Sequence, residues 1–249
     1  MIRTANESDF DRKISSESEL RICALKRAYG LNVPFIRFFA DDEGSLASVM
    51  DGFCNVYVHK KLNEEWQTFL QMHADIRTIH ADENTIAILA TARRIPFKKG
   101  VVMRFDNMLS KCALHANEQN ACSLYALYVF LSTVFDDFPL FDGWYVDVSH
   151  RVRHGCCHIA TESENERLIG CAMTVAETDT AALIGGVSTS PEHRGRGVAS
   201  RCISELLTRL PQKNVFIAPS DEPAAGLYRK LGFVPCGTWA ELTLPYSGG

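Results

Sequence analysis

The segment between residues 190 and 199 constrains this chain more than any other. An apolar, strand-like run over residues 181–189 leads into Ser190-Pro191-Glu192-His193-Arg194-Gly195-Arg196-Gly197, and a helical pattern starts at once. A helix N-terminus presents unpaired N–H groups and a partial positive charge. Gly195 and Gly197 lack the Cβ atoms that would keep a ligand away from the backbone, and Arg194 and Arg196 add positive charge. The segment therefore suits a diphosphate group.

Two other phosphate-binding motifs fit these residues poorly. A P-loop would end in Gly-Lys-Ser/Thr, whereas this segment ends in Gly197-Val198-Ala199. A dinucleotide-binding fingerprint would need a third glycine at Ser200, and it would open the first βα unit of a domain. An ordinary glycine-rich turn without a ligand is the remaining alternative, because such turns are common in proteins.

The rest of the sequence predicts an α/β protein in two parts, a mixed α/β N-terminal region over residues 1–118 and a second domain over residues 119–249. In the first part we expect a helix over 17–29 that ends at Gly30, and a hairpin that turns at Asp51-Gly52. The same part is expected to contain strands at 35–39, 45–50, 53–58, 76–80 and 101–105 and a helix at 64–73. The hairpin, helix and strand of residues 35–80 loosely echo those of residues 156–218, which hints at an internal duplication.

In the second part, two helices are followed by a series of strands. Residues 122–135 are apolar almost all round, so we expect a buried helix, and residues 144–153 form an amphipathic one. The remaining expected elements are strands at 156–161 and 168–176 joined by the turn 162–167, a strand at 181–189, a helix at 199–210, a strand at 215–218, a helix at 223–231, and strands at 233–236 and 241–244. Gly185-Gly186, within the strand at 181–189, indicates a bulge or a close backbone approach.

Two motifs in this second part resemble the GNAT superfamily of N-acetyltransferases. Arg194-Gly195-Arg196-Gly197-Val198-Ala199 fits the family pattern Arg/Gln-x-x-Gly-x-Gly/Ala, and Leu227-Tyr228-Arg229-Lys230-Leu231-Gly232-Phe233 is similar to the family's Leu-Tyr-x-Lys-x-Gly-Phe. The resemblance implies a GNAT-like, mostly antiparallel central sheet flanked by helices over residues 119–249. Residues 1–118 carry neither motif, and we interpret them as a degenerate GNAT-like copy that does not bind CoA.

The resemblance also implies a site for acetyl-CoA as cosubstrate. The strand at 181–189 would splay from the strand at 215–218, and the main chain of Val187, Ser188 and Thr189 would pair with the pantetheine arm. The pyrophosphate would be held by the residues of the loop and the helix start, which are Arg194, Gly195, Arg196, Gly197, Val198, Ala199 and Ser200. Asp221 stands where many relatives have an asparagine that contacts CoA; alternatively it caps the following helix.

The catalytic groups are less constrained than the cofactor loop. Tyr228 matches the family tyrosine near the CoA sulfur, and a phenol that stays protonated at neutral pH can donate to a leaving thiolate; a core tyrosine is the alternative. Ala181 occupies the position where several family members place a glutamate base. Glu177 is therefore our catalytic candidate for proton transfer through water, against the alternative of a solvated turn carboxylate. His158 is a weaker candidate, and we expect no metal site because Cys156 and His158 have no second pair at zinc spacing.

Bulk properties set the remaining expectations. The formal net charge of −4 gives no electrostatic reason to expect a nucleic-acid or anionic-membrane partner, and no apolar run approaches the ~20 residues that span a bilayer. The polar start of the sequence lacks a leader pattern, and the nine cysteines are scattered, so we expect a cytoplasmic protein with reduced thiols.

The functional expectation is an acetyl-CoA-dependent N-acetyltransferase that acts in a ternary complex on a small-molecule or peptide amine. The alternative is a non-catalytic acyl-CoA-binding sensor or regulatory module, which Ala181 favours. For the N-terminal region we expect either a cover over the acceptor site or a homodimer interface.

Overall fold

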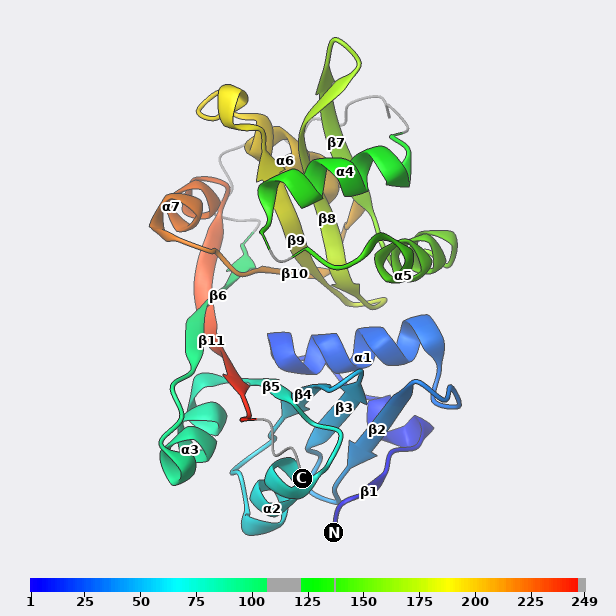
Figure 1. The fold of residues 1–249 in the computed structure, drawn as a ribbon, viewed down its shortest axis with the longest axis vertical. Coiled ribbons are helices and arrows are strands. Elements are labelled where there is room, and N and C mark those ends of the chain that lie inside the picture. The colour runs from blue at the N-terminus through cyan, green and yellow to red at the C-terminus, as the bar shows by residue number, and fades with distance from the viewer. Residues whose placement is uncertain (107–121, 137, 246–249) are drawn as a thin grey trace. The chain divides into compact units, whose positions relative to one another are not determined.

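The computed structural model describes residues 1–106, 122–136 and 138–245, and it divides into two compact units (Figure 1). The N-terminal unit comprises Met1–Val102 and Pro235–Gly249, and the C-terminal unit comprises Met103–Val234. The sequence-predicted division after residue 118 lies outside the described residues and stays a prediction. Among the residues described, no helix is both long and apolar enough to cross a membrane.

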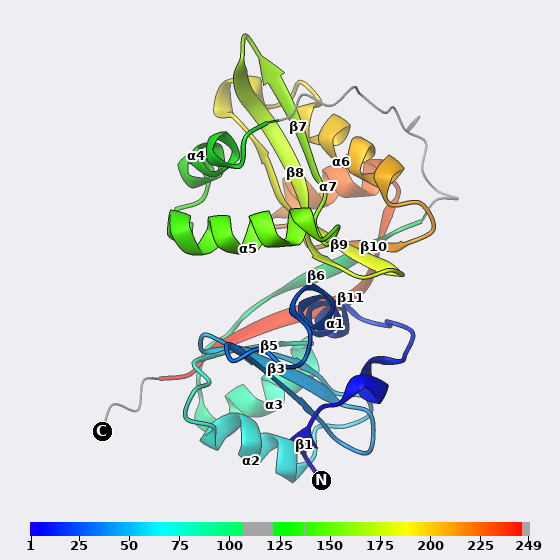
Figure 2. The same ribbon diagram turned by 90° about the vertical axis from the view of Figure 1, so that its right-hand side faces the viewer.

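The N-terminal unit is a mixed sheet with helices on both faces. Its strands follow the order β1-β2-β3-β4-β5-β11, in which β4 and β5 are parallel and the other pairs are antiparallel. Figure 2 shows α1 on one side of this sheet and α2 and α3 on the other. The elements are β1 (Arg3–Thr4), η1 (Glu7–Phe10), α1 (Glu17–Tyr29), β2 (Ile36–Ala40), β3 (Leu46–Met50), β4 (Phe53–Tyr57), α2 (Glu64–Met72), β5 (Thr78–Ala81), α3 (Glu83–Arg93) and the start of β6 (Lys98–Phe105).

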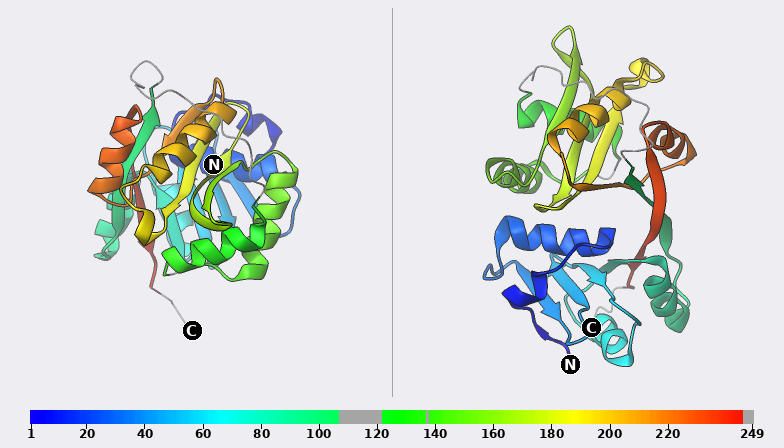
Figure 3. Two further views of the ribbon diagram at one scale, coloured as in Figure 1. Left: turned by 90° about the horizontal axis from the view of Figure 1, so that it is seen from above. Right: turned by 180° about the vertical axis from the view of Figure 1, so that it is seen from behind.

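The C-terminal unit has a sheet in the order β6-β10-β9-β8-β7, in which only β9 and β10 are parallel. The helices α4 and α5 lie on one face of this sheet and α6 lies on the other (Figure 3). Their apolar side chains pack against the sheet. The elements are α4 (Leu124–Val134), α5 (Phe141–Arg153), β7 (Ile159–Glu164), β8 (Arg167–Glu177), β9 (Ala181–Thr189), η2 (Pro191–His193), α6 (Val198–Arg209), β10 (Asn214–Ile217), α7 (Glu222–Lys230) and β11 (Phe233–Thr243).

Both units use a strand from a distant part of the chain. The end of β6 belongs to the C-terminal unit, where Met103 and Arg104 pair with β10. Most of β11 belongs to the N-terminal unit, where residues 240–243 pair with β5. Along the chain the order helix, three strands, helix, strand, helix, strand occurs twice, as α1-β2-β3-β4-α2-β5-α3-β6 and as α5-β7-β8-β9-α6-β10-α7-β11, and the last strand of each series extends into the other unit.

The structure confirms the mixed, mostly antiparallel fold class and several local predictions. The helix over 17–29 ends at Gly30 as predicted, and Asp51 and Gly52 both have positive φ, as a two-residue hairpin turn requires. The predicted bounds of the strand at 181–189 are those of β9.

Other local predictions were wrong. The strands predicted at 233–236 and 241–244 are one strand, β11, and β1 and α3 were missed. The turn predicted over 162–167 is only Asn165-Glu166, because β7 and β8 extend further on both sides. The helix α4 is not buried all round: Tyr125 is 63% exposed and Val129 43%, since only one side of α4 contacts the sheet.

Gly30 and Gly143 allow a matched test of backbone strain. Gly30 adopts φ 76° and ψ −177°, a conformation that only glycine tolerates, whereas Gly143 lies within α5, and an added Cβ meets nothing within 4 Å at either position. Gly30→Ala should therefore lower the free energy of unfolding by about 1–3 kcal/mol. Gly143→Ala should raise it by about 0.5–1 kcal/mol, because alanine favours helix. Denaturant titration measures both, and equal effects would contradict the assignment of strain to Gly30.

Candidate active site

The centre of the candidate site is a gap in the pairing of two parallel strands. The register between β9 and β10 runs from Ala181 opposite Asn214 to Ile184 opposite Ile217, although β9 continues to Thr189. Backbone N–H and C=O groups are obligatory hydrogen-bonding groups, so a strand that outruns its neighbour offers a ladder edge to a ligand. The residues that follow Ile184 in β9 are those predicted to bind the pantetheine arm.

A bulge in β9 lies just beyond Ile184, the last residue of β9 that pairs with β10. The pairing of β8 with β9 shifts between Cys171 opposite Ser188 and Met173 opposite Gly185, so β9 contains one extra residue there. Gly186 has φ 57°, and a Cβ added at Gly185 would lie 2.8 Å from Val175 Cγ1. The bulge predicted from Gly185-Gly186 is confirmed, and it requires glycine because of both conformation and close packing.

The loop after β9 forms an open cradle at the start of α6. Gly195 and Gly197 both have φ 77°, and Gly197 is the N-cap of α6 without a side-chain capping bond. By contrast, Asp221 caps α7 by accepting a hydrogen bond from the Ala224 N–H at 2.8 Å. An added Cβ at Gly195 meets nothing within 4 Å, so the space in front of the loop is open. The exposed helix start is suited to an anion.

A pocket of about 340 Å³ joins the strand edge, the loop and α7. The predicted cofactor residues that line it are Val187, Ser188, Thr189, Arg194, Gly195, Gly197, Val198, Ala199 and Ser200, and the predicted catalytic residue Tyr228 joins them. Sequence reasoning missed His193, Ser220, Pro223, Ala224 and Leu227, which also line it. Arg196, Asp221 and Glu177 are not among the lining residues. His193 directly precedes the first motif and Leu227 is the first residue of the second, so the motifs themselves were the available signal.

The residues of this pocket fit a CoA diphosphate and pantetheine. The Ser188 hydroxyl is buried and has no hydrogen-bond partner among the described residues, so it is available to a ligand. The exposed side chain of Arg194 supplies positive charge beside the uncapped start of α6. A polar strand edge followed by a cationic helix start matches a molecule with amide groups followed by phosphates.

Tyr228 is the one buried phenol in the lining of this pocket. It lies on α7 and is 5% exposed. Burial raises the pKa of Tyr228 to about 12, with a smaller contribution from the negative charge of Asp221. The phenol is therefore protonated throughout the physiological pH range and can act as a proton donor, but not as a base.

Glu177 lies away from the pocket, at the other end of β8. It pairs with Ala182, whereas Gly170 pairs with Thr189, so seven residues or about 23 Å of strand separate it from that end of β9. The Glu177 carboxylate accepts hydrogen bonds from Lys213 Nζ at 2.8 Å and from Thr174 Oγ1 at 2.8 Å, and it contacts His158 Nδ1 at 2.9 Å. Burial alone would raise the pKa of Glu177, but these contacts outweigh it and lower the pKa to about 2. Such a carboxylate is a weak base.

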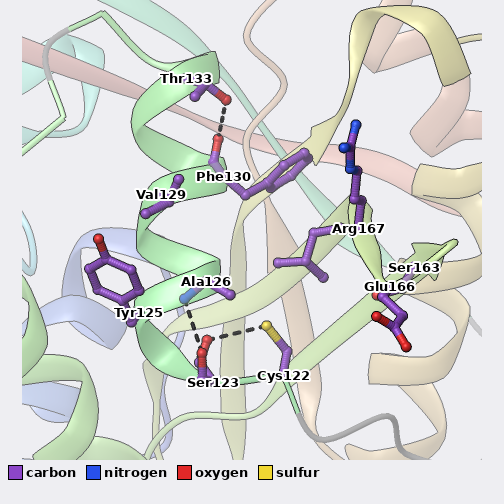
Figure 4. Close-up of a pocket in the computed structure, with 11 residues that line it drawn as sticks. Cys122, Ser123, Tyr125, Ala126, Val129, Phe130, Thr133, Ser163, Glu166 and Arg167 are labelled. Carbon is purple, nitrogen blue, oxygen red and sulfur yellow. Dashed lines mark hydrogen bonds between the residues drawn. The ribbon is translucent and has the colours of Figure 1, made fainter.

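A larger pocket of about 800 Å³ lies on the α4 side of the C-terminal unit (Figure 4). It is lined by Cys122, Ser123, Tyr125, Ala126, Val129, Phe130 and Thr133, and by Ser163, Glu166, Arg167 and Leu168 near the β7–β8 turn. None of the residues of the two motifs lines it, and the N-terminus of α4 there is capped by the Ser123 hydroxyl. Size alone therefore does not identify the functional site. Among the residues described, no group of three or more His, Cys, Asp and Glu side chains is arranged to hold a metal ion.

The N-terminal unit has the same strand geometry without the same helix start. β4 and β5 are parallel, like β9 and β10, and α2 follows β4 as α6 follows β9. The first turn of α2 contains Glu64 and Glu65, and the Asn63 side chain caps it by accepting from the Trp66 N–H at 2.9 Å. A capped, acidic helix start disfavours an anion. This geometry supports the interpretation that the unit does not bind CoA.

The low pKa of Glu177 makes a signed prediction about acid stability. A carboxyl with a folded pKa of about 2, against an ordinary value of 4.5, stabilises the fold fully above pH 4.5 and loses this contribution as the pH falls toward 2. Glu177→Gln should lower the free energy of unfolding at pH 7 by up to about 3 kcal/mol, and the difference from wild type should shrink between pH 4.5 and pH 2. Denaturant titrations across this range measure it. A pH-independent difference would show that the charge of Glu177 does not stabilise the fold.

Comparison with known proteins agrees with this geometry. Residues 114–233 match the model of the family described as "Acetyltransferase (GNAT) family". A UPF0039 protein of Schizosaccharomyces pombe is 28% identical over 85 residues, which cover 32% of this chain and 57% of that protein. The match thus spans little more than half the length of this curated relative.

Solved structures with similar folds cover nearly the whole chain. A GNAT-family acetyltransferase from Colwellia psychrerythraea aligns with a TM-score of 0.58 and 14% identity, over 98% of this chain and 100% of that one. A GCN5-related N-acetyltransferase from Sphaerobacter thermophilus aligns with a TM-score of 0.59 and 17% identity, over 97% and 94%. A tandem GNAT protein from the clavulanic acid biosynthesis pathway aligns with a TM-score of 0.53 and 14% identity, over 94% and 91%. At these identities the likeness is one of fold. The C-terminal part of this chain, which holds the strand gap and the loop at the start of α6, is a GNAT-family domain.

Proposed function

We propose that this protein is an acetyl-CoA-dependent N-acyltransferase that acts on an amine in a ternary complex. The observation that carries the proposal is the single pocket in which the exposed edge of β9, the uncapped start of α6 and the buried phenol of Tyr228 meet. The GNAT fold supports acyl transfer in general. The acetyl donor and the amine acceptor, a small molecule or a peptide, are the proposed refinements.

The residues of this pocket would divide the work of binding. The loop from Arg194 to Gly197 and the N–H groups of Val198, Ala199 and Ser200 would hold the diphosphate, and the main chain of Val187 and Thr189 would hold the pantetheine amides. Acetyl-CoA supplies the thioester. With these two parts of the molecule held, its acyl group would lie in the same pocket as Tyr228.

Tyr228 would assist the departure of the thiol. A neutral acceptor amine attacks the thioester carbonyl carbon, so that a C–N bond forms and the C–S bond breaks. The Tyr228 phenol donates its proton to the departing sulfur, and the surplus amine proton passes to solvent, from which the phenolate regains one. With a pKa of about 12, Tyr228 is in the required protonated form over the whole physiological range.

A non-catalytic acyl-CoA-binding role is the second candidate, and a specific observation favours it. Ala181 stands at the position of the family's glutamate base, and Glu177 is held in buried contacts that make it a weak base. Incubation with acetyl-CoA and a panel of amines, with detection of free thiol, separates the two functions. Thiol release that depends on an amine supports the enzyme, whereas tight CoA binding without turnover supports the sensor.

Tyr228→Phe should lower turnover by about a hundredfold, because it removes the proton donor, and should leave the affinity for CoA nearly unchanged. Tyr125→Phe, at an exposed tyrosine of α4 outside this pocket, is the matched control and should change neither quantity. Thiol release measures the turnover, and isothermal titration calorimetry measures the affinity for CoA. Undiminished turnover of Tyr228→Phe would remove the phenol from the mechanism.

Arg194 and Arg196 provide a second comparison within the loop. Arg194 lines the pocket and Arg196 does not, although both side chains are exposed. Arg194→Ala should weaken CoA binding by about tenfold, the effect of losing one charge-assisted hydrogen bond, and Arg196→Ala should have a smaller effect. Titration calorimetry at low salt measures both. Equal losses would mean that the loop acts only through its total charge.

A further inference from the structure

An edge strand holds the downstream end of the cofactor loop. Glu162 of β7 binds Arg201 of α6 through two hydrogen bonds, from Nε to Oε2 at 2.9 Å and from Nη2 to Oε1 at 2.6 Å. Arg201 in turn donates from Nη1 to the carbonyl oxygen of Arg196 at 2.9 Å. The same Nη1 lies so near Gly197 that an added Cβ there would meet it at 3.1 Å. Glu162 thus fixes Arg201, and Arg201 fixes the loop next to the N-cap of α6.

The same strand also holds the upstream end of the loop. Glu164 Oε2 lies 2.9 Å from His193 Nε2, and His193 Nδ1 lies 2.7 Å from the Ser190 hydroxyl. An ionised carboxylate only accepts, so Nε2–H donates to Glu164 and a neutral ring accepts the Ser190 proton at Nδ1. The hydrogen bond from His193 is the main cause of the lowered pKa of Glu164. Since His193 lines the pocket, this chain of contacts reaches the cofactor site itself.

Simple electrostatics makes two carboxylates here unexpected. Glu162 and Glu164 are two residues apart on β7, so strand alternation directs both to the same side, where a diphosphate would bind nearby. Through charge alone, each would repel the cofactor and weaken its binding. The loop, however, contains two left-handed glycines, which lose much conformational freedom when they are ordered. Contacts that order the loop in advance reduce this cost of binding.

We propose that Glu162 and Glu164 are positioning residues that hold the two ends of the 193–197 loop in the form that binds the diphosphate of CoA. The inference rests on the proposed function for the identity of the ligand. It goes beyond that function because it assigns a cofactor-binding role to the β7 edge strand, which contacts the loop through Arg201 and His193. The two carboxylates hold the loop in place, and the loop binds the diphosphate of the cofactor.

The sign of a charge-removing substitution tests the proposal. Glu162→Ala and Glu164→Ala each remove a negative charge, and positioning predicts that each weakens CoA binding by about two- to fivefold, the range expected for one exposed ion pair. Glu192→Ala is the matched control, because this exposed carboxylate lies in the same loop segment and makes neither contact. Its removal should leave CoA affinity unchanged or improve it. Glu164→Gln, which retains an acceptor for His193, should recover part of the affinity lost in Glu164→Ala.

Kinetics and hydrogen exchange separate positioning from other effects. In steady-state assays the Glu162→Ala and Glu164→Ala substitutions should raise the KM for acetyl-CoA and leave kcat nearly unchanged. In the ligand-free Ala variants, the backbone amides of residues 193–199 should exchange hydrogen faster than in wild type or in Glu192→Ala. Thermal melts identify any variant that fails to fold. If an Ala variant fails to fold, the CoA affinities of Glu164→Gln and Arg201→Lys are compared with that of wild type instead. If the Ala variants bind CoA as Glu192→Ala does and exchange like wild type, the positioning role is overturned. If wild type binds no CoA but hydrogen exchange in the loop still becomes faster in the Ala variants, the proposed function is wrong. Glu162 and Glu164 then hold the loop without a role in CoA binding.

Discussion

The early end of the pairing between β9 and β10 is the constraint on which the candidate site depends. β10 ends at Ile217, opposite Ile184, whereas β9 runs on to Thr189, so the last residues of β9 have no partner in β10. The bulge at Gly186 marks the point where β9 changes direction, and β8 continues to pair with it on the other side. The exposed length of β9 then leads directly into the loop and the start of α6. One strand thus joins an exposed backbone edge to a helix start that is suited to an anion.

A comparison of the two units shows what converts this geometry into a binding site. In both units a helix follows the strand of the parallel pair that comes first along the chain. In the C-terminal unit the helix starts with an uncapped glycine, and its loop carries arginines. In the N-terminal unit an asparagine caps the helix and two glutamates follow. The strand arrangement is therefore a scaffold, and a few residues at the helix start decide whether an anion is favoured there.

Two sets of polar groups in the C-terminal unit differ in whether the fold already supplies their partners. Glu177, Lys213, His158 and Thr174 satisfy one another at one end of β8, so their charges are already balanced within the fold. At the other end, Ser188 has a buried hydroxyl without a partner among the described residues, and the N-terminus of α6 lacks a side-chain cap. Balanced polar groups stabilise the structure, whereas groups left over after folding are those available to a ligand.

The sequence by itself determined the glycine loop before α6, the bounds of β9, the bulge at Gly185-Gly186 and the placement of Tyr228 on a later helix. These features are local: glycine conformation, strand periodicity and helix start signals act within about ten residues, so they can be read from neighbouring positions. The tertiary structure decided the partners of β6 and β11, the one-sided exposure of α4, the distance of Glu177 from the pocket and the contacts of Glu162 and Glu164 with the loop. These features depend on which distant segments of the chain meet in the fold, and no pattern of neighbouring residues records such long-range contacts.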